Sequence, residues 1–311
     1  MQRTPVSIFL ILVTTLLVSA CSKQAIYENA ISWERSSSGL ETAQLSIGEL
    51  DITYLRSKET VDADTLVLIH GFGANKDNWT RLAKELEGEF NIYAFDLPGH
   101  GDSSKPLDIG YRFEDQVRYL NQVFAELGIT QAHMMGNSMG GAITALYAAT
   151  HPEQIQTAVL FDPAGIFEYE SELVDLVLDG DNPLIPKKAG DFDRLLDFAL
   201  EKRPFVPWPI FDVMEEKAIA NRDVNEVIFA AIRDSGFEPD FRNAITHIEA
   251  PVLVVWGKLD RVIDYRNADV FVEAIPDARK AILDDVGHAP MVEVPAESAR
   301  LFREFLVDSQ H

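Results

Sequence analysis

A single serine stands among glycines in the segment GNSMGG, which begins at Gly136. Gly136, Ser138 and Gly140 form the pattern G-x-S-x-G, between an apolar stretch (132–135) and a helix-forming stretch (139–150). At a strand–turn–helix junction this pattern holds the serine backbone in a strained conformation that exposes the hydroxyl. Glycine is needed two positions before and after the serine, where a side chain would meet neighbouring backbone. We therefore predict that Ser138 is a nucleophile.

A serine hydroxyl is a weak nucleophile unless a base accepts its proton. His288, in DDVGHAPMVEVP, follows the last predicted strand in a short loop and is the expected base. An acid must orient this histidine, and two aspartates follow strands: Asp260 in VVWGKLDRVI and Asp162 in VLFDPAG. The position of Asp260 after the penultimate strand favours it. Asp162 stays open as the alternative acid, and Asp264 is a more remote one.

The negative oxygen that forms during acyl transfer needs two fixed N–H donors. Met139, directly after the serine, is expected to supply one backbone N–H. The loop after LVLIHGFG is expected to supply the other, most simply from Phe72. His70 and His100 lie in loops beside this site and are expected to hold loop backbone.

Composition limits the classes of partner. The 311 residues are 47% apolar, which suffices for a sizeable core, and the formal net charge is −23. An acidic protein of this kind is repelled by nucleic-acid phosphate, so no nucleic-acid partner is expected. The sequence contains no H-E-x-x-H, G-x-x-x-x-G-K or G-x-G-x-x-G pattern. We therefore expect neither a metal nor a cofactor.

The N-terminus has the layout of an export signal. Arg3 precedes an apolar run (8–18), which is shorter than the roughly 20 residues that a bilayer span needs. The segment LVSA before Cys21, the only cysteine, resembles the lipobox of bacterial lipoproteins. We predict a signal peptide (1–20), a lipidated Cys21, a polar tether (21–42) and a membrane-anchored protein in the bacterial cell envelope. A secreted protein, or one anchored by an uncleaved N-terminal segment, stays open.

The rest of the chain alternates strands and helices, which predicts an α/β fold with a mostly parallel, doubly wound sheet. The core is assigned to residues 43–165 and 248–311. The predicted strands are a hairpin around Gly48 and the segments 65–70, 91–95, 131–135, 156–162, 251–257 and 279–285, and the predicted helices are 78–90, 111–127, 139–150 and 265–275.

Residues 166–247 break this alternation, because they contain helical segments but no convincing buried strand. We predict that they form a helical cap or lid over the edge of the sheet that carries Ser138. The stretch RPFVPWPIF (203–211) is rich in aromatic residues and prolines. Two interpretations stay open: its aromatics line a substrate entrance or contact lipid, or they are buried in a rigid turn. Trp208 and Phe211 are the candidate substrate-binding residues.

The set LIHGFGANKDNW, DLPGHGDSSKP, GNSMGGAI, VVWGKLD and DVGHAPMVE resembles the α/β-hydrolase superfamily over residues 44–307. It is most similar to small bacterial lipases and esterases of the monoacylglycerol and triacylglycerol lipase type. The resemblance implies hydrolysis of a lipid or small carboxylester through an acyl-enzyme, without a cofactor.

Two alternatives to this function stay open. Carbon–carbon hydrolases of the meta-cleavage product type carry a similar GNSMGG segment, although an export signal argues against them. A lipoprotein that binds apolar ligands without catalysis is the other, and the complete serine, aspartate and histidine set argues against it.

Overall fold

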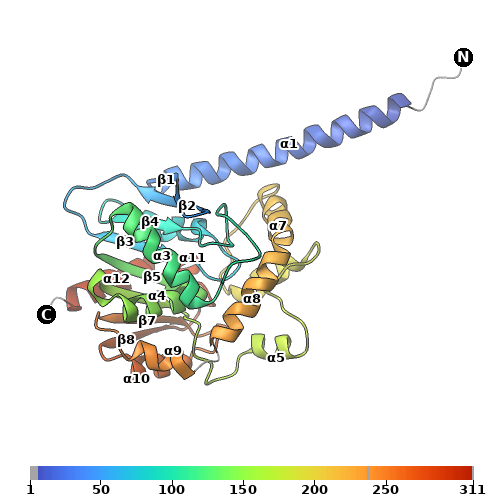
Figure 1. Cartoon of the computed structure of the whole chain (residues 1–311). Helices are drawn as coiled ribbons and strands as arrows, with labels where there is room; N and C mark the ends of the chain where they lie inside the picture. The colour runs from blue at the N-terminus through green and yellow to red at the C-terminus, as the bar shows by residue number, and fades with distance from the viewer. Residues whose placement is uncertain (1–5, 237–238, 310–311) are drawn as a thin grey trace, which may run out of the picture.

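The computed structural model describes residues 6–236 and 239–309, with the side chains of 22–235 and 240–309. Its centre is an eight-stranded sheet in the order β1-β2-β4-β3-β5-β6-β7-β8 (Figure 1). The strands from β4 to β8 run parallel, whereas β2 is antiparallel to both of its neighbours. The predicted α/β-hydrolase architecture is thus confirmed. The strands are β1 (Leu40–Ile47), β2 (Leu50–Ser57), β3 (Thr65–Ile69), β4 (Asn91–Phe95), β5 (Ala132–Asn137), β6 (Ile155–Phe161), β7 (Val252–Gly257) and β8 (Ala278–Leu283).

Helices cover both faces of the sheet, and a buried apolar cluster lies between each face and its helices. This arrangement explains the near-continuous apolar runs of the central strands, which are buried on both sides. The helices outside the insertion are α1 (Val6–Ser37), α2 (Thr80–Glu85), α3 (Phe113–Leu127), α4 (Met139–Thr150), α10 (Asn267–Ala274), α11 (Pro290–Glu293) and α12 (Pro295–Ser309), with short 3-10 helices at Lys76–Trp79 and Pro152–Gln154.

The carboxyl ends of the parallel strands meet at one edge of the sheet. Ser138 directly follows β5, Asp162 directly follows β6, and Asp260 and His288 lie in the loops after β7 and β8. This edge is where open α/β sheets bind their ligands. The topology therefore collects the candidate residues from four separate parts of the sequence.

The insertion between β6 and β7 is helical, and its described residues contain no strand. Three of its helices lie along one side of the sheet in Figure 1, where α7 and α8 are labelled above α5. The helices of the insertion are α5 (Glu172–Leu178), α6 (Asp191–Ala199), α7 (Ile210–Ala220), α8 (Arg222–Gly236) and α9 (Pro239–Ile245).

The segment predicted as a tether (21–42) differs from the expectation. Helix α1 runs to Ser37, and β1 starts at Leu40, before the predicted start of the core. Its polar side chains have partners on the body: Lys23 pairs with Asp212 of α7 at 2.6 Å, and Arg35 pairs with Asp77 at 2.6 Å. These ion pairs, which sequence patterns do not reveal, hold the helical segment against the body.

Helix α1 projects away from the body toward the N-terminus (Figure 1). The predicted signal peptide (1–20) and the Cys21 side chain lie outside the residues whose side chains are described. Within the described part of the chain, none of the helices has both the length and the apolar character that crossing a membrane requires.

Candidate active site

Ser138 occupies a sharp turn between β5 and α4. Its backbone has φ 55° and ψ −118°. Residues other than glycine rarely adopt this backbone conformation, which costs on the order of 1–3 kcal/mol. A Cβ at Gly136 would lie 2.0 Å from the Gly140 carbonyl oxygen, and one at Gly140 would lie 2.2 Å from the Ile69 carbonyl oxygen. Both glycines are therefore required by close backbone contacts, as the G-x-S-x-G pattern predicts.

Asp260 and His288 form a buried pair. The Nδ1 of His288 donates to Oδ2 of Asp260 at 2.7 Å, and the exposed fractions of the two side chains are 10% and 0%. Oδ2 also accepts from Trp256 Nε1 at 3.2 Å, while Oδ1 accepts from the N–H groups of Val262 at 2.7 Å and Ile263 at 3.1 Å. Four donors thus fix the orientation of the Asp260 side chain toward the histidine.

Neither alternative acid makes this contact. Asp264 is paired with Arg266 at 2.7 Å, and the hydrogen bond from Arg266 lowers the pKa of Asp264. Asp162 is fully buried, and its Oδ1 accepts from the Gly257 N–H at 2.8 Å. Of the three aspartates, only Asp260 is bonded to His288.

Asn137 joins the turn that carries Ser138 to the loop after β8 that carries His288, called the histidine loop below. Its Nδ2 donates to the His288 carbonyl oxygen at 2.9 Å and to the Phe161 carbonyl oxygen at 3.2 Å. Asn137 directly precedes Ser138, so these bonds hold the turn against the histidine loop. The G-x-S-x-G pattern leaves this position undefined, and sequence reasoning missed its role.

Glu293 is a second residue that the sequence did not reveal. Its carboxylate accepts from the N–H groups of Gly287 at 3.1 Å and Ala289 at 3.3 Å, on either side of His288. It also accepts from the N–H groups of Glu201 at 3.0 Å and Lys202 at 2.7 Å, just after α6. One side chain therefore holds both the histidine loop and the adjoining part of the insertion.

The loop that contains Phe72 faces the serine. A Cβ at Gly71 would lie 3.2 Å from the Ser138 Cβ, so the loop and the turn are in direct contact. Within the described residues, the backbone N–H groups of Phe72 and Met139 donate to no protein acceptor. Two unused donors beside the serine are the arrangement that stabilises a developing oxyanion.

Two histidines hold the backbone of the surrounding loops, as expected. His70 Nδ1 donates to the Gly71 carbonyl oxygen at 2.7 Å, and its Nε2 accepts from the Leu97 N–H at 3.1 Å. Burial lowers the pKa of His70 to about 4, so the ring is neutral at neutral pH. His100 Nδ1 donates to the Pro98 carbonyl oxygen at 3.2 Å.

A buried lysine also fastens the Phe72 loop. Lys76, whose side chain is 1% exposed, contacts Asp96 and Asp102 at 2.7 Å each, and its own N–H donates to Asp96 at 2.7 Å. Asp96 is fully buried. The network joins the loop after β3 to the loop after β4.

We predict that Lys76→Met lowers the free energy of unfolding by about 3–5 kcal/mol, because Asp96 is left buried without its partner. Urea denaturation measures this effect. Lys258→Met is the matched control: Lys258 pairs with Asp284 at 2.7 Å with both side chains exposed, so its loss costs at most about 1 kcal/mol. Equal losses for the two variants would contradict the prediction.

The insertion contacts two loops of the site. The Phe72 ring contacts Phe229 of α8, with ring centroids 5.4 Å apart. The His288 N–H donates to the carbonyl oxygen of Ala199, at the end of α6, at 2.8 Å. Helices α6 and α8 of the insertion therefore contact the loops that carry His288 and Phe72.

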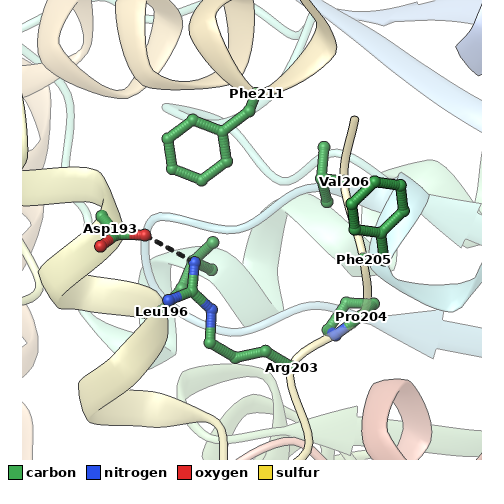
Figure 2. Close-up of a pocket in the computed structure, with 7 residues that line it drawn as sticks. All are labelled: Asp193, Leu196, Arg203, Pro204, Phe205, Val206 and Phe211. Carbon is green, nitrogen blue, oxygen red and sulfur yellow. Dashed lines mark hydrogen bonds and ion pairs between the residues drawn. The ribbon is translucent and has the colours of Figure 1, made fainter. Parts of the chain in front are cut away.

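A pocket of about 470 Å³ in the insertion is lined by residues of α6, of the segment that follows it and of α7 (Figure 2). Phe211 lines this pocket, whereas Trp208 does not and is 71% exposed. Trp208 instead lies near the Lys23 ammonium of α1, 5.9 Å from its ring centroid. The structure therefore separates the two aromatic candidates. The pocket is lined by Asp193, Leu196, Arg203, Pro204, Phe205, Val206 and Phe211.

The pocket is apolar apart from one ion-paired cluster. Arg203 contacts Asp193 at 2.8 Å, the bond drawn in Figure 2, and also pairs with Asp197. Because two carboxylates neutralise it, Arg203 is a poor anchor for an anionic ligand. No side chain of the Ser138, Asp260 and His288 set lines this pocket.

Comparison with known proteins identifies the family of the chain. A family model described as alpha/beta hydrolase fold matches residues 64–195. Lipase 3 from Moraxella sp. (strain TA144) is 36% identical over 283 residues, which cover 89% of this chain and 88% of that lipase. The crystal structure of a bacterial membrane phospholipase A shares 36% identity with a TM-score of 0.90 and covers 98% of this chain and 99% of that one.

This chain shares only its fold with a more distant protein of known structure. The 2-hydroxy-6-oxo-6-phenylhexa-2,4-dienoate hydrolase from Rhodococcus sp. strain RHA1 is 22% identical, with a TM-score of 0.73, and the match covers 86% of this chain and 99% of that one. The identity to Lipase 3 over nearly the full length of both proteins is more informative. The chain therefore belongs to the α/β-hydrolase family and, by its lipase relatives, to the serine ester hydrolases within it.

Proposed function

We propose that this protein is a lipase that cleaves esters of apolar acyl chains through an acyl-enzyme on Ser138. The observation that carries the proposal is the 2.7 Å bond between Asp260 and His288, at the sheet edge where Ser138 occupies its strained turn. In this proposal Ser138 is the nucleophile, His288 the general base and Asp260 the acid that orients it. The lipase relatives support the ester class.

The proposed reaction proceeds in two halves. His288 Nδ1 is committed to Asp260, so Nε2 accepts the Ser138 proton as Oγ bonds to the carbonyl carbon of the ester. The N–H groups of Phe72 and Met139 stabilise the resulting oxyanion. When the intermediate collapses, His288 returns the proton to the leaving alcohol, and water then releases the fatty acid by the same steps.

Carbon–carbon hydrolysis is the competing function, and charge argues against it. The insertion from 166 to 247 contains 18 acidic and 9 basic residues, a net charge of −9. A free dienoate anion is repelled by this cover, whereas a neutral ester is not. The likeness to the dienoate hydrolase is limited to the fold.

A substrate panel tests the proposed function. Purified enzyme is given p-nitrophenyl esters, a monoacylglycerol, a triacylglycerol, a phospholipid and a dienoic ring-fission product. Hydrolysis of the carboxylesters alone is expected, and the same panel identifies the preferred headgroup. Cleavage of the dienoate without activity on any ester overturns the proposal. Binding of these lipids without turnover supports the non-catalytic lipoprotein instead.

We also propose that the enzyme is exported and held on the bacterial membrane through a lipidated Cys21. The support is the signal-like leader, the sequence LVSA before Cys21, and the membrane phospholipase among its relatives of known structure.

Replacing Cys21 is expected to change the location of the protein and not its chemistry. A single acyl chain binds membranes only marginally, whereas the several chains of a lipoprotein hold firmly. Cys21→Ser should therefore release active enzyme or leave an unprocessed precursor, measured by fractionation and by labelling with a radioactive fatty acid. Ser22→Ala is the control and should keep the label. A Cys21→Ser protein that is still processed and membrane-bound contradicts the prediction.

The acyl-length preference should depend on Phe211 and not on Trp208. Phe211 lines the pocket, and each methylene buried there contributes about 0.8 kcal/mol, so Phe211→Ala should shift the preferred acyl length by several carbons. Trp208→Ala should keep the wild-type profile, because this ring is outside the pocket. Rates on p-nitrophenyl esters from acetate to palmitate measure both. Identical profiles for wild type and Phe211→Ala exclude this pocket from acyl binding.

A further inference from the structure

Asp162 is a buried carboxyl group that the proposed reaction does not use. Asp162 is fully buried. Its backbone φ is 46°, a value that is rare for residues other than glycine. Oδ1 accepts one hydrogen bond, from the Gly257 N–H at 2.8 Å, while Oδ2 has no hydrogen-bond partner among the residues that the structure describes. A buried carboxylate oxygen without a donor is costly, so its protonation state needs an explanation.

The unpartnered group lies beside the proposed acid and base. One polar atom each of Asp162, Asp260 and His288 lie within 4.8 Å of one another. Two carboxyl groups at such a distance do not both ionise readily in a buried site, because each negative charge opposes the other. A single proton on one of them removes the repulsion and supplies the missing donor.

The surroundings decide which carboxyl group carries this proton. Asp260 accepts four hydrogen bonds, from Val262, Ile263, Trp256 and His288, all of which stabilise the ionised form. Asp162 accepts one. Asp162 therefore lacks the donors that a carboxylate needs, and its neutral form is favoured.

The charged groups around Asp162 act in the same direction. Burial raises the pKa of Asp162 well above its ordinary range, and the negative charges of Asp260 and of Glu293 on α11 raise it further. The Gly257 N–H opposes this shift. His288, the remaining titratable group of the cluster, is already bonded to Asp260.

We propose that Asp162 is a neutral carboxylic acid that donates its Oδ2 proton toward the Asp260 carboxylate and so positions that carboxylate for His288. The two aspartates form a unit with one negative charge, in which Asp162 is a positioning residue. This inference rests on the proposed function, because it assigns Asp260 and His288 the roles given above.

Asparagine distinguishes a neutral Asp162 from an ionised one. Asp162→Asn keeps the shape, the acceptor for Gly257 and a donor toward Asp260, so the acid limb of the pH profile of kcat/KM should stay in place. If Asp162 were ionised, the substitution would remove a negative charge within 4.8 Å of the base. The limb would then move to lower pH by about one unit or more, because protonating His288 becomes harder. Such a shift overturns the proposal.

Alanine at the same position tests the hydrogen bond itself. Asp162→Ala removes the donor, and kcat should fall by about 10- to 100-fold, the usual contribution of a hydrogen bond to a charged group. The acid limb should move to higher pH in this variant, because the Asp260 carboxylate loses a donor that disperses its charge. A purely structural role predicts no such movement, and recovery of the limb in Asp162→Asn completes the test.

Infrared difference spectroscopy provides a measurement that needs no turnover. In the Ser138→Ala background at neutral pH, adding Asp162→Asn should remove the C=O stretch of a protonated carboxylic acid. Adding Asp264→Asn should remove only carboxylate bands, because Arg266 holds that group ionised. Loss of only carboxylate bands from Asp162→Asn refutes the neutral acid. Since this measurement is independent of activity, failure of the proposed hydrolase function and failure of this inference are distinguishable.

Discussion

Ser138→Ala is expected to lower kcat for ester hydrolysis by about 10⁶-fold, the scale on which other serine hydrolases lose turnover with their nucleophile. The loss arises because no other hydroxyl group stands in the strained turn between β5 and α4, so the acyl-enzyme cannot form. The residual rate should come only from substrate binding and from the N–H groups of Phe72 and Met139.

The fold of this variant should be intact. Within the described residues the Ser138 hydroxyl makes no hydrogen bond, and the turn is fixed by the contacts of Gly136 and Gly140 instead. We therefore expect the free energy of unfolding to change by less than about 1 kcal/mol.

A fluorophosphonate probe followed by peptide mapping provides the second measurement. Wild-type enzyme should be labelled at Ser138, and Ser138→Ala should not be labelled. Ser103→Ala serves as a control, since this buried serine donates to the Asp96 carbonyl oxygen at 2.7 Å and has no role in the chemistry. Labelling of any residue other than Ser138 would falsify the assignment of the nucleophile.

The residues that sequence analysis identified are those with a strong local pattern. The turn at Ser138 requires glycine at fixed offsets, so it is visible within five residues. Asp260 and His288 each follow a strand that reads as a continuous apolar run, and the parallel sheet brings such strand ends together. Local spacing and a single topological rule thus suffice to predict the core of the site.

The residues that were missed act through contacts between distant parts of the chain. Asn137 bonds to the backbone of a residue 151 positions away, and Glu293 to backbone 91 and 92 positions away. Neither contact leaves a periodic signal. The same reason explains why the segment 22–37 was predicted to be a polar tether. Its sequence is polar, and the partners of Lys23 and Arg35, which are Asp212 and Asp77, lie far away along the chain.

Asp260→Asn is expected to lower kcat by about 10⁴-fold, the loss seen when the aspartate of such a triad becomes an amide. The physical reason is the bond from His288 Nδ1 to Oδ2 at 2.7 Å, which selects the tautomer with a free Nε2. In Asp260→Asn the N–H groups of Val262 and Ile263 hold the amide oxygen at the Oδ1 position, so the NH2 group faces His288 and favours the tautomer with a protonated Nε2. The neutral amide also no longer stabilises a protonated imidazole.

The matched control for this loss is Asp162→Asn, in a second buried aspartate of the same cluster. Asp162 has no bond to His288, and within the described part of the chain its one donor is the Gly257 N–H, from which an asparagine oxygen can also accept. The loss in kcat should therefore be smaller than that of Asp260→Asn by a factor of about 10³ or more. Single-turnover rates on one p-nitrophenyl ester compare the two variants directly, with circular dichroism as the check on folding. A larger loss in Asp162→Asn than in Asp260→Asn would transfer the role of the acid to the strand end after β6.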